Sequence, residues 1–202
     1  MRYWKSVLTS GLLALCLLVP AALSARAQTS VELAELQLEQ ADDGLYLSAR
    51  LRFDLPAAVE DALNKGIAVY FVSSAEVLRE RWYWVDKQVA SAQRHMRVAY
   101  QPLTRRWRLN VSSQPIANSN LAMAFAQHYD TLQEAMASVR RIARWHIATV
   151  DELEPGGRQR VQFRFQLDAS QLPRTLQIGV IGDADWTLSM ERSIDLTQGA
   201  GL

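Results

Sequence analysis

The chain has 202 residues, a formal net charge of +1 and an apolar fraction of 49%. A near-neutral chain of this length can build a hydrophobic core, and it lacks the basic excess of a general nucleic-acid binder. Because only 21% of the residues are charged, disorder is also excluded for most of the chain.

The first 27 residues have the pattern of a secretory signal. Arg2 and Lys5 precede an apolar stretch from Val7 to Val19. Ala25-Arg26-Ala27 then offers small residues to a signal peptidase, which places the cut before Gln28. We therefore expect a periplasmic protein. The alternative is an uncleaved segment that anchors the chain in the inner membrane, since the stretch approaches the length that spans a bilayer.

The only cysteine, Cys16, lies inside this segment. It follows Leu15, which is not the small residue that a lipoprotein signal needs, so we expect no lipidation. Without the signal the chain has no cysteine and a net charge of −2, because the segment removed holds three basic and no acidic residues. Disulfide and thiol chemistry are then excluded from residues 28–202.

Alternating apolar and polar residues predict a first hairpin. Leu45 to Phe53 alternates in this way and pairs with Leu36 and Leu38 across a turn at Ala41-Asp42-Asp43-Gly44. A helix is predicted next, from Asp54-Leu55-Pro56 to Gly66.

The middle of the chain again predicts strands. Residues 67–77 begin with a run that is apolar on both faces, which is typical of a central strand. Alternating segments follow at 89–100, 105–111 and 121–125.

A second helix is predicted at Thr131, where Glu134 completes a capping box. Its apolar face runs from Leu132 to Ala143, and Arg140, Arg141 and Arg144 follow near its end.

Three more strands are predicted, at 158–168, 176–181 and 186–190. About nine strands with two short helices that do not alternate regularly with them indicate a mainly β protein. We expect an antiparallel β-sandwich, immunoglobulin-like or similar, formed as a single domain by residues 28–202.

Five motifs follow one another along the chain: Arg81-Trp82-Tyr83-Trp84-Val85-Asp86, Tyr100-Gln101-Pro102-Leu103-Thr104-Arg105, Thr131-Leu132-Gln133-Glu134-Ala135, Leu167-Asp168-Ala169-Ser170-Gln171-Leu172-Pro173 and Asp185-Trp186-Thr187-Leu188. This ordered set resembles an exported proteobacterial family, the domain of unknown function 4390. The resemblance implies a periplasmic or membrane-anchored protein of Gram-negative bacteria and supplies no catalytic residues.

No pattern of residues indicates catalysis or a cofactor. His95, His128 and His146 share no metal-ligand spacing, and His95 is predicted to be a surface residue on the polar face of its strand. The sequence has no Gly-x-Ser-x-Gly elbow and no Ser-x-x-Lys motif. We therefore expect neither catalytic, metal nor cofactor-binding residues.

An aromatic cluster is the first candidate binding surface. Arg81, Trp82 and Trp84 lie within four residues, and on a strand the two tryptophans would share one face. They either fill the sandwich core or form an exposed platform for a sugar polymer, a peptide or a protein surface.

Arginines on the polar faces of strands form the second candidate surface: Arg106, Arg108, Arg160 and Arg164. If their strands are neighbours, the guanidinium groups can bind carboxylates or phosphates. The alternative is a solvated face on which the arginines pair with the chain's own acids.

These observations favour a non-enzymatic periplasmic module that binds a protein partner of the cell envelope. One form of this hypothesis makes the module an accessory of a membrane sensor. Binding of an anionic lipid headgroup or cell-wall fragment through the arginines is the alternative. An enzyme with an unrecognised site is the third. We expect no nucleic-acid ligand, and membrane contact only if the signal stays uncleaved.

Overall fold

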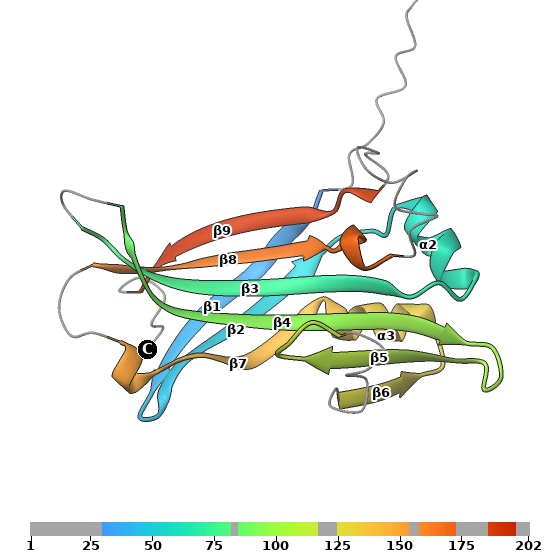
Figure 1. Cartoon of the computed structure of the whole chain (residues 1–202), viewed down its shortest axis with the longest axis horizontal. Helices are drawn as coiled ribbons and strands as arrows, with labels where there is room; N and C mark the ends of the chain where they lie inside the picture. Colours follow the sequence, from blue (N-terminus) through green and yellow to red (C-terminus); the bar gives the residue numbers. More distant parts are fainter. Residues whose placement is uncertain (1–29, 82–84, 117–124, 154–157, 173–185, 197–202) are drawn as a thin grey trace, which may run out of the picture.

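A computed structural model of the chain describes residues 30–81, 85–116, 125–153, 158–172 and 186–196 (Figure 1). These ranges form two β-sheets, two α-helices and two short 3-10 turns. The strands are β1 (Glu32–Ala41), β2 (Gly44–Arg52), β3 (Val69–Arg79), β4 (Lys87–Gln101), β5 (Arg106–Ser112), β6 (Phe125–Tyr129), β7 (Arg141–Thr149), β8 (Gln159–Leu167) and β9 (Ser189–Asp195); the helices are α2 (Ala57–Asn64) and α3 (Leu132–Val139), and the turns are η3 (Val150–Glu152) and η4 (Ala169–Gln171).

The two sheets differ in size and lie face to face. The smaller has the strand order β1-β2-β7 and the larger the order β6-β5-β4-β3-β8-β9. Every described strand pair is antiparallel. In Figure 1 the three-stranded sheet crosses behind the six-stranded one at an angle. This arrangement confirms the predicted mainly β, sandwich-like fold.

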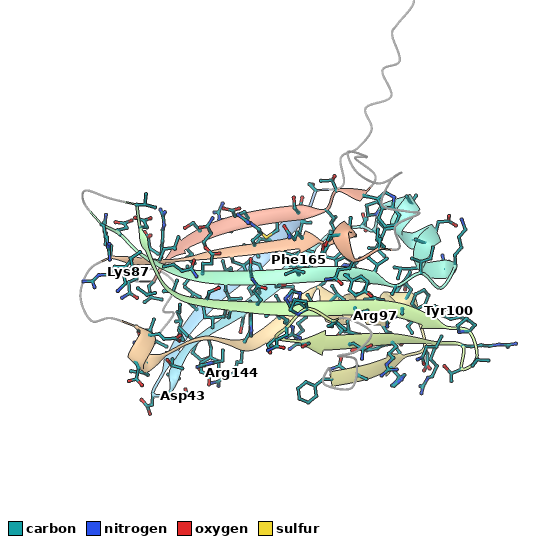
Figure 2. The ribbon with its side chains drawn as sticks, viewed as in Figure 1. Asp43, Lys87, Arg97, Tyr100, Arg144 and Phe165 are labelled. Carbon is teal, nitrogen blue, oxygen red and sulfur yellow. The ribbon has the colours of Figure 1, made fainter. Side chains whose placement is uncertain are left out.

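Three phenylalanines join the two sheets in the core. Phe53, which directly follows β2, has its ring centroid 6.3 Å from that of Phe71 and 5.3 Å from that of Phe165. Phe71 of β3 and Phe165 of β8 stack at 5.8 Å. Phe71 and Phe165 are completely buried, and Figure 2 shows Phe165 near the middle of the molecule. Burial of such large apolar surfaces is the main force that holds the sheets together.

The predicted first hairpin is confirmed. Leu38 of β1 pairs with Leu47 of β2, and Ala41 pairs with Gly44 at the turn. Gly44 has a φ angle of +151°, and a Cβ atom there would lie 2.2 Å from the carbonyl oxygen of Ala148 on β7. A side chain at this position would push β7 away, so the close approach of the two strands requires glycine.

The predicted central strand is also confirmed, because β3 lies between β4 and β8 in the larger sheet. The first predicted helix is found as α2, with Pro56 at its N-cap position. It covers one end of the sandwich, near the ends of β3 and β4 (Figure 1).

The second helix begins as predicted but ends earlier. Thr131 and Glu134 form both hydrogen bonds of the capping box, and the helix stops at Val139. The prediction that its apolar face continues to Ala143 is wrong, because residues from Arg141 onward form β7 against β2. The hydrogen bonds of β2 and the burial of Ile142 in the core outweigh the helical pattern.

Strand β7 was not among the predicted strands because a bulge interrupts its alternation. Arg144 has a φ angle of +41°, and the pairing of β2 with β7 changes register between Leu47 and Ala49. The inward positions therefore shift from Ile142 to Ile147, with two exposed residues in succession between them. Of the other predicted strands, 186–190 overlaps β9 only at Ser189 and Met190, because residues 186–188 precede the strand and β9 continues to Asp195. The predicted strand at 176–181 and most of 121–125 lie outside the described residues.

Candidate binding surface

A groove runs along one open side of the sandwich, between β1 of the smaller sheet and β9 of the larger. It encloses about 1050 Å³. Among the described residues, β1 pairs only with β2 and β9 only with β8, so each presents an unpaired edge to this groove. An unpaired strand edge carries backbone N–H and C=O groups that can accept another strand. The groove is lined by Val31 to Leu36 and Met190 to Asp195, with Arg160 of β8.

Apolar side chains form the floor of the groove. Leu33 and Leu36 of β1 and Met190 and Ile194 of β9 are partly buried and pack against the core. Ile194 lies opposite Val161 in the sheet, so it points inward. Leu33 and Leu36 of β1 both face inward although they are three residues apart instead of two, because the strand has a bulge between Leu33 and Glu35. Apolar surface therefore continues from the core to the opening.

Charged side chains form the rim, and carboxylates predominate over guanidinium groups. The acids are Glu32, Glu35, Glu191 and Asp195, and the bases are Arg160 and Arg192.

Part of this rim is held by ion pairs within the protein. Arg164 lies 2.7 Å from Glu191 and, with Gln162, holds the pKa of the Glu191 carboxyl below its usual range. Arg160 lies 2.5 Å from Asp86, in the connection between β3 and β4. These contacts fix the positions of the charges beside the opening.

The candidate residues predicted from the sequence are spread over the larger sheet. Arg81 is exposed just after the end of β3, whereas Trp82 and Trp84 lie outside the described residues. Arg106 is bound to Asp130 at 2.9 Å. Arg108 is partly exposed, but its Nε atom is buried and has no hydrogen-bond partner.

The four strand arginines do not form a continuous ribbon. Arg106 and Arg108 lie on β5, Arg160 and Arg164 on β8, and strands β4 and β3 separate them. All four point to the outer face of the larger sheet, as the register of the strands shows. Three of them pair with the protein's own carboxylates, as the solvated-face interpretation predicts. Arg160 is the member of this set that lines the groove.

The prediction that His95 is a surface residue is wrong, since only 8% of it is exposed. It does lie on the outer face of β4, but Val72 of β3 and Ser112 of β5 flank it in register. Its Nε2 atom lies 3.1 Å from Oε1 of Gln93. Desolvation lowers the pKa of His95, and the nearby charge of Asp168 opposes this shift.

The sequence did not identify the groove residues of β1 and β9. Their alternation predicts strands, but period two does not show which strands become edges or which edges face each other. The bulge in β1 also interrupts the alternation, so the sequence spacing does not show that Leu33 and Leu36 lie on the same face.

The described residues contain no group of three or more His, Cys, Asp or Glu side chains placed to hold a metal ion. None of the helices in these ranges combines the length and the apolar character needed to cross a bilayer.

Comparison with known proteins gives one match. The family model described as domain of unknown function 4390 matches residues 28–194. No curated protein and no solved structure was found to match the chain.

Proposed function

The chain belongs to the family described as domain of unknown function 4390, and we propose that it acts as a non-enzymatic module that binds a protein partner in the bacterial cell envelope. The groove between β1 and β9 is the observation that carries this proposal. The signal-like pattern of residues 1–27 supports export to the periplasm, and cell fractionation distinguishes a released protein from an anchored one.

The occupant that fits the groove best is an extended segment of the partner. In the part of the chain that the structure describes, the edges of β1 and β9 that border the groove are unpaired, so a further strand can add to either sheet through backbone hydrogen bonds. The floor of Leu33, Leu36, Met190 and Ile194 suits apolar side chains at alternate positions of that segment. Because carboxylates predominate on the rim, basic residues between the apolar ones complement it.

The state of one rim carboxylate, Glu191, favours binding over catalysis at that residue. A general acid needs a raised pKa, close to the pH at which the enzyme works. Glu191 has its pKa shifted downward by Arg164 and Gln162, so it stays ionised. Arg164 already pairs with this charge, so recognition of a basic segment rests on other acids of the rim, Glu32 and Asp195 among them.

Site-directed cross-linking tests the proposal. Cys16 is the only cysteine of the chain, so a Cys16→Ala background leaves no thiol. Into it we would introduce Ser193→Cys at the groove and, as a matched control, Ser91→Cys at an exposed site on β4. Each is labelled with a photoactivatable thiol reagent and irradiated in envelope extracts.

The expected result is one specific protein captured from Ser193→Cys and not from Ser91→Cys. Charge reversal at the rim, by Glu32→Lys with Asp195→Lys, should lower the yield at least several-fold because a basic segment would then be repelled. Equal capture from both cysteines, or a cross-link only within the chain itself, would contradict a partner-binding groove.

A further inference from the structure

A second hollow lies on the other open side of the sandwich, where β5 ends, β6 begins and β4 extends beyond both. The last residue pair between β4 and β5 joins His95 to Ser112, whereas β4 itself starts at Lys87. Among the described residues, the part of β4 before His95 therefore has a strand neighbour only on the β3 side. Trp145 of β7 faces this gap and closes a hollow of about 270 Å³, which we call the Arg94 notch. The residues that line it are Gln93, Arg94, Val111, Ser112, Ser113, Phe125 and Trp145.

Arg94 is an unusual residue for this place. The register of β4 puts it on the inner face, between the inward residues Ala92 and Met96 and opposite Ser73 of β3. Its Nε atom is buried without a hydrogen-bond partner, and none of the described carboxylates forms an ion pair with it. Burial lowers the pKa of its guanidinium group, and no charge on the described residues contributes to the shift. The side chain is thus partly desolvated without a counter-charge, which is costly for a cation.

Other arginines of the protein show what is missing at Arg94. Arg106, Arg144 and Arg164 are exposed, yet each lies within 3.3 Å of a carboxylate oxygen. The hydroxyl of Ser73, opposite Arg94, is fully buried and also lacks a hydrogen-bond partner. The Nε–H of Arg94 and the hydroxyl of Ser73 are thus two buried polar groups on neighbouring strands that lack a hydrogen-bond partner.

The walls of the notch are mostly apolar and aromatic. Phe125 at the start of β6 is 80% exposed, although large apolar side chains are usually buried. Trp145 is partly buried and packs against the core, and Val111 lies opposite Phe125 in the sheet. An exposed phenylalanine beside a partly buried tryptophan provides two ring faces for an apolar ligand.

We propose that the Arg94 notch binds a small monocarboxylate with an apolar body, whose carboxylate is held by Arg94 and whose body lies between Phe125 and Trp145. Guanidinium binds a carboxylate with two parallel hydrogen bonds, which supplies the missing acceptor. Arg94 is the only charged residue among the described lining residues, so a single negative charge is balanced and a phosphate dianion is not. A hollow of about 270 Å³ suits a short aliphatic or single-ring acid.

This site is separate from the groove between β1 and β9. β1 and β7 are the opposite edges of the smaller sheet, and the notch lies on the β7 side. Ligand binding there needs no partner protein, so failure of either proposal leaves the other standing.

Ligand-observed NMR with sodium hexanoate tests the proposal on the purified protein at neutral pH. We expect saturable binding of hexanoate, and binding at least ten-fold weaker for hexanol, which lacks the charge, and for acetate, which lacks the apolar body. Inorganic phosphate should not compete. Equal affinity for hexanol and hexanoate, displacement by phosphate, or no binding of hexanoate would overturn the assignment.

Variants test whether the hexanoate detected by NMR is bound in the Arg94 notch. Arg94→Gln should weaken hexanoate at least ten-fold, while Arg164→Gln, at an exposed arginine of the same sheet, should leave its affinity within two-fold. Phe125→Ala should weaken hexanoate several-fold, and the exposure of this ring makes its removal harmless to folding. Unchanged affinity in both Arg94→Gln and Phe125→Ala would overturn the proposal. Circular dichroism and thermal melting establish that each variant is folded.

Discussion

Burial changes the chemistry of two consecutive side chains of β4, Arg94 on the inner face and His95 on the outer face. Both pKa values are lowered because water is removed from the charged form. For Arg94 the group remains a cation, since an arginine is deprotonated only at extreme pH. For His95 the shift favours the neutral imidazole, so its protonation requires a pH below the ordinary value of a histidine.

We predict that His95 makes the protein less stable as the pH falls. Its pKa in the folded state is below the ordinary value of 6.5, so below that pH the unfolded chain binds more protons than the folded one. The free energy of unfolding should therefore be highest above pH 6.5 and should decrease as the pH falls through that value toward the folded-state pKa. Urea unfolding at a series of pH values above and below 6.5 measures how the free energy of unfolding changes.

His95→Gln should flatten this part of the pH dependence, because glutamine does not titrate. His128→Gln is the matched control, since His128 is an exposed histidine on the same outer face. If His95→Gln retains the full slope of the wild-type protein, the burial of His95 does not control it.

The sequence placed His95 on the correct face of its strand but did not show that it is buried. Alternation reports the direction of a side chain, not what lies beside it. The flanking residues, Val72 and Ser112, belong to strands whose neighbours cannot be read from a period of two.

Helix α3 shows which parts of an element are locally encoded. Its beginning depends on contacts between residues close in sequence: the Thr131 hydroxyl accepts a hydrogen bond from the Glu134 backbone N–H at 3.2 Å, and the Glu134 carboxylate accepts one from the Thr131 N–H at 3.2 Å. Both bonds follow from the capping-box pattern, so the start was predictable. Its end depends on β2, which pairs with the residues from Arg141 onward.

We predict that Thr131→Ala lowers the free energy of unfolding by about 1 kcal/mol, the usual cost of losing an N-cap side chain. Thr131→Ser keeps the hydroxyl and should stay close to the wild-type value. Urea unfolding followed by circular dichroism measures the difference between the two variants. An alanine variant as stable as the serine variant would show that the cap contributes nothing.

Strand β7 illustrates why some elements escape prediction. Val139, Ile142 and Ala143 continue the spacing of an amphipathic helix, and the bulge at Arg144 removes the alternation that would indicate a strand. The strand forms because β2 supplies its hydrogen bonds from about 95 residues earlier in the chain. Such distant partners leave no local signal.

At the scale of the whole molecule, the two sheets share one core. Phe53 packs on Phe71 and Phe165, so the residue that follows β2 of the smaller sheet contacts two adjacent inner strands of the larger one, β3 and β8. The sandwich architecture was predictable from the number and patterning of the strands. The strand order was not, and it determines both the groove between β1 and β9 and the Arg94 notch.

We predict that Phe165→Ala lowers the free energy of unfolding by about 3–5 kcal/mol, as is typical for removing a large ring from a packed core. The remaining protein should still unfold in one transition, because both sheets depend on the same core. Phe125→Ala, at a ring that is 80% exposed, should change the free energy of unfolding by no more than about 0.5 kcal/mol. Calorimetry checks both expectations, and two separate transitions in the wild-type protein would contradict a shared core.

The position of β3 between β4 and β8 also has a consequence for the order of events during biosynthesis. β4 follows β3 directly, but the residues of β8, Gln159–Leu167, leave the ribosome only after β5, β6, α3 and β7. Until then β3 has an open edge in the middle of the future sheet, and its side chains lack the rings of β8. Pairing between such distant segments is slow. The nascent chain should therefore remain unfolded until nearly all of it has been made, which is the form in which a polypeptide can be threaded through a secretion pore.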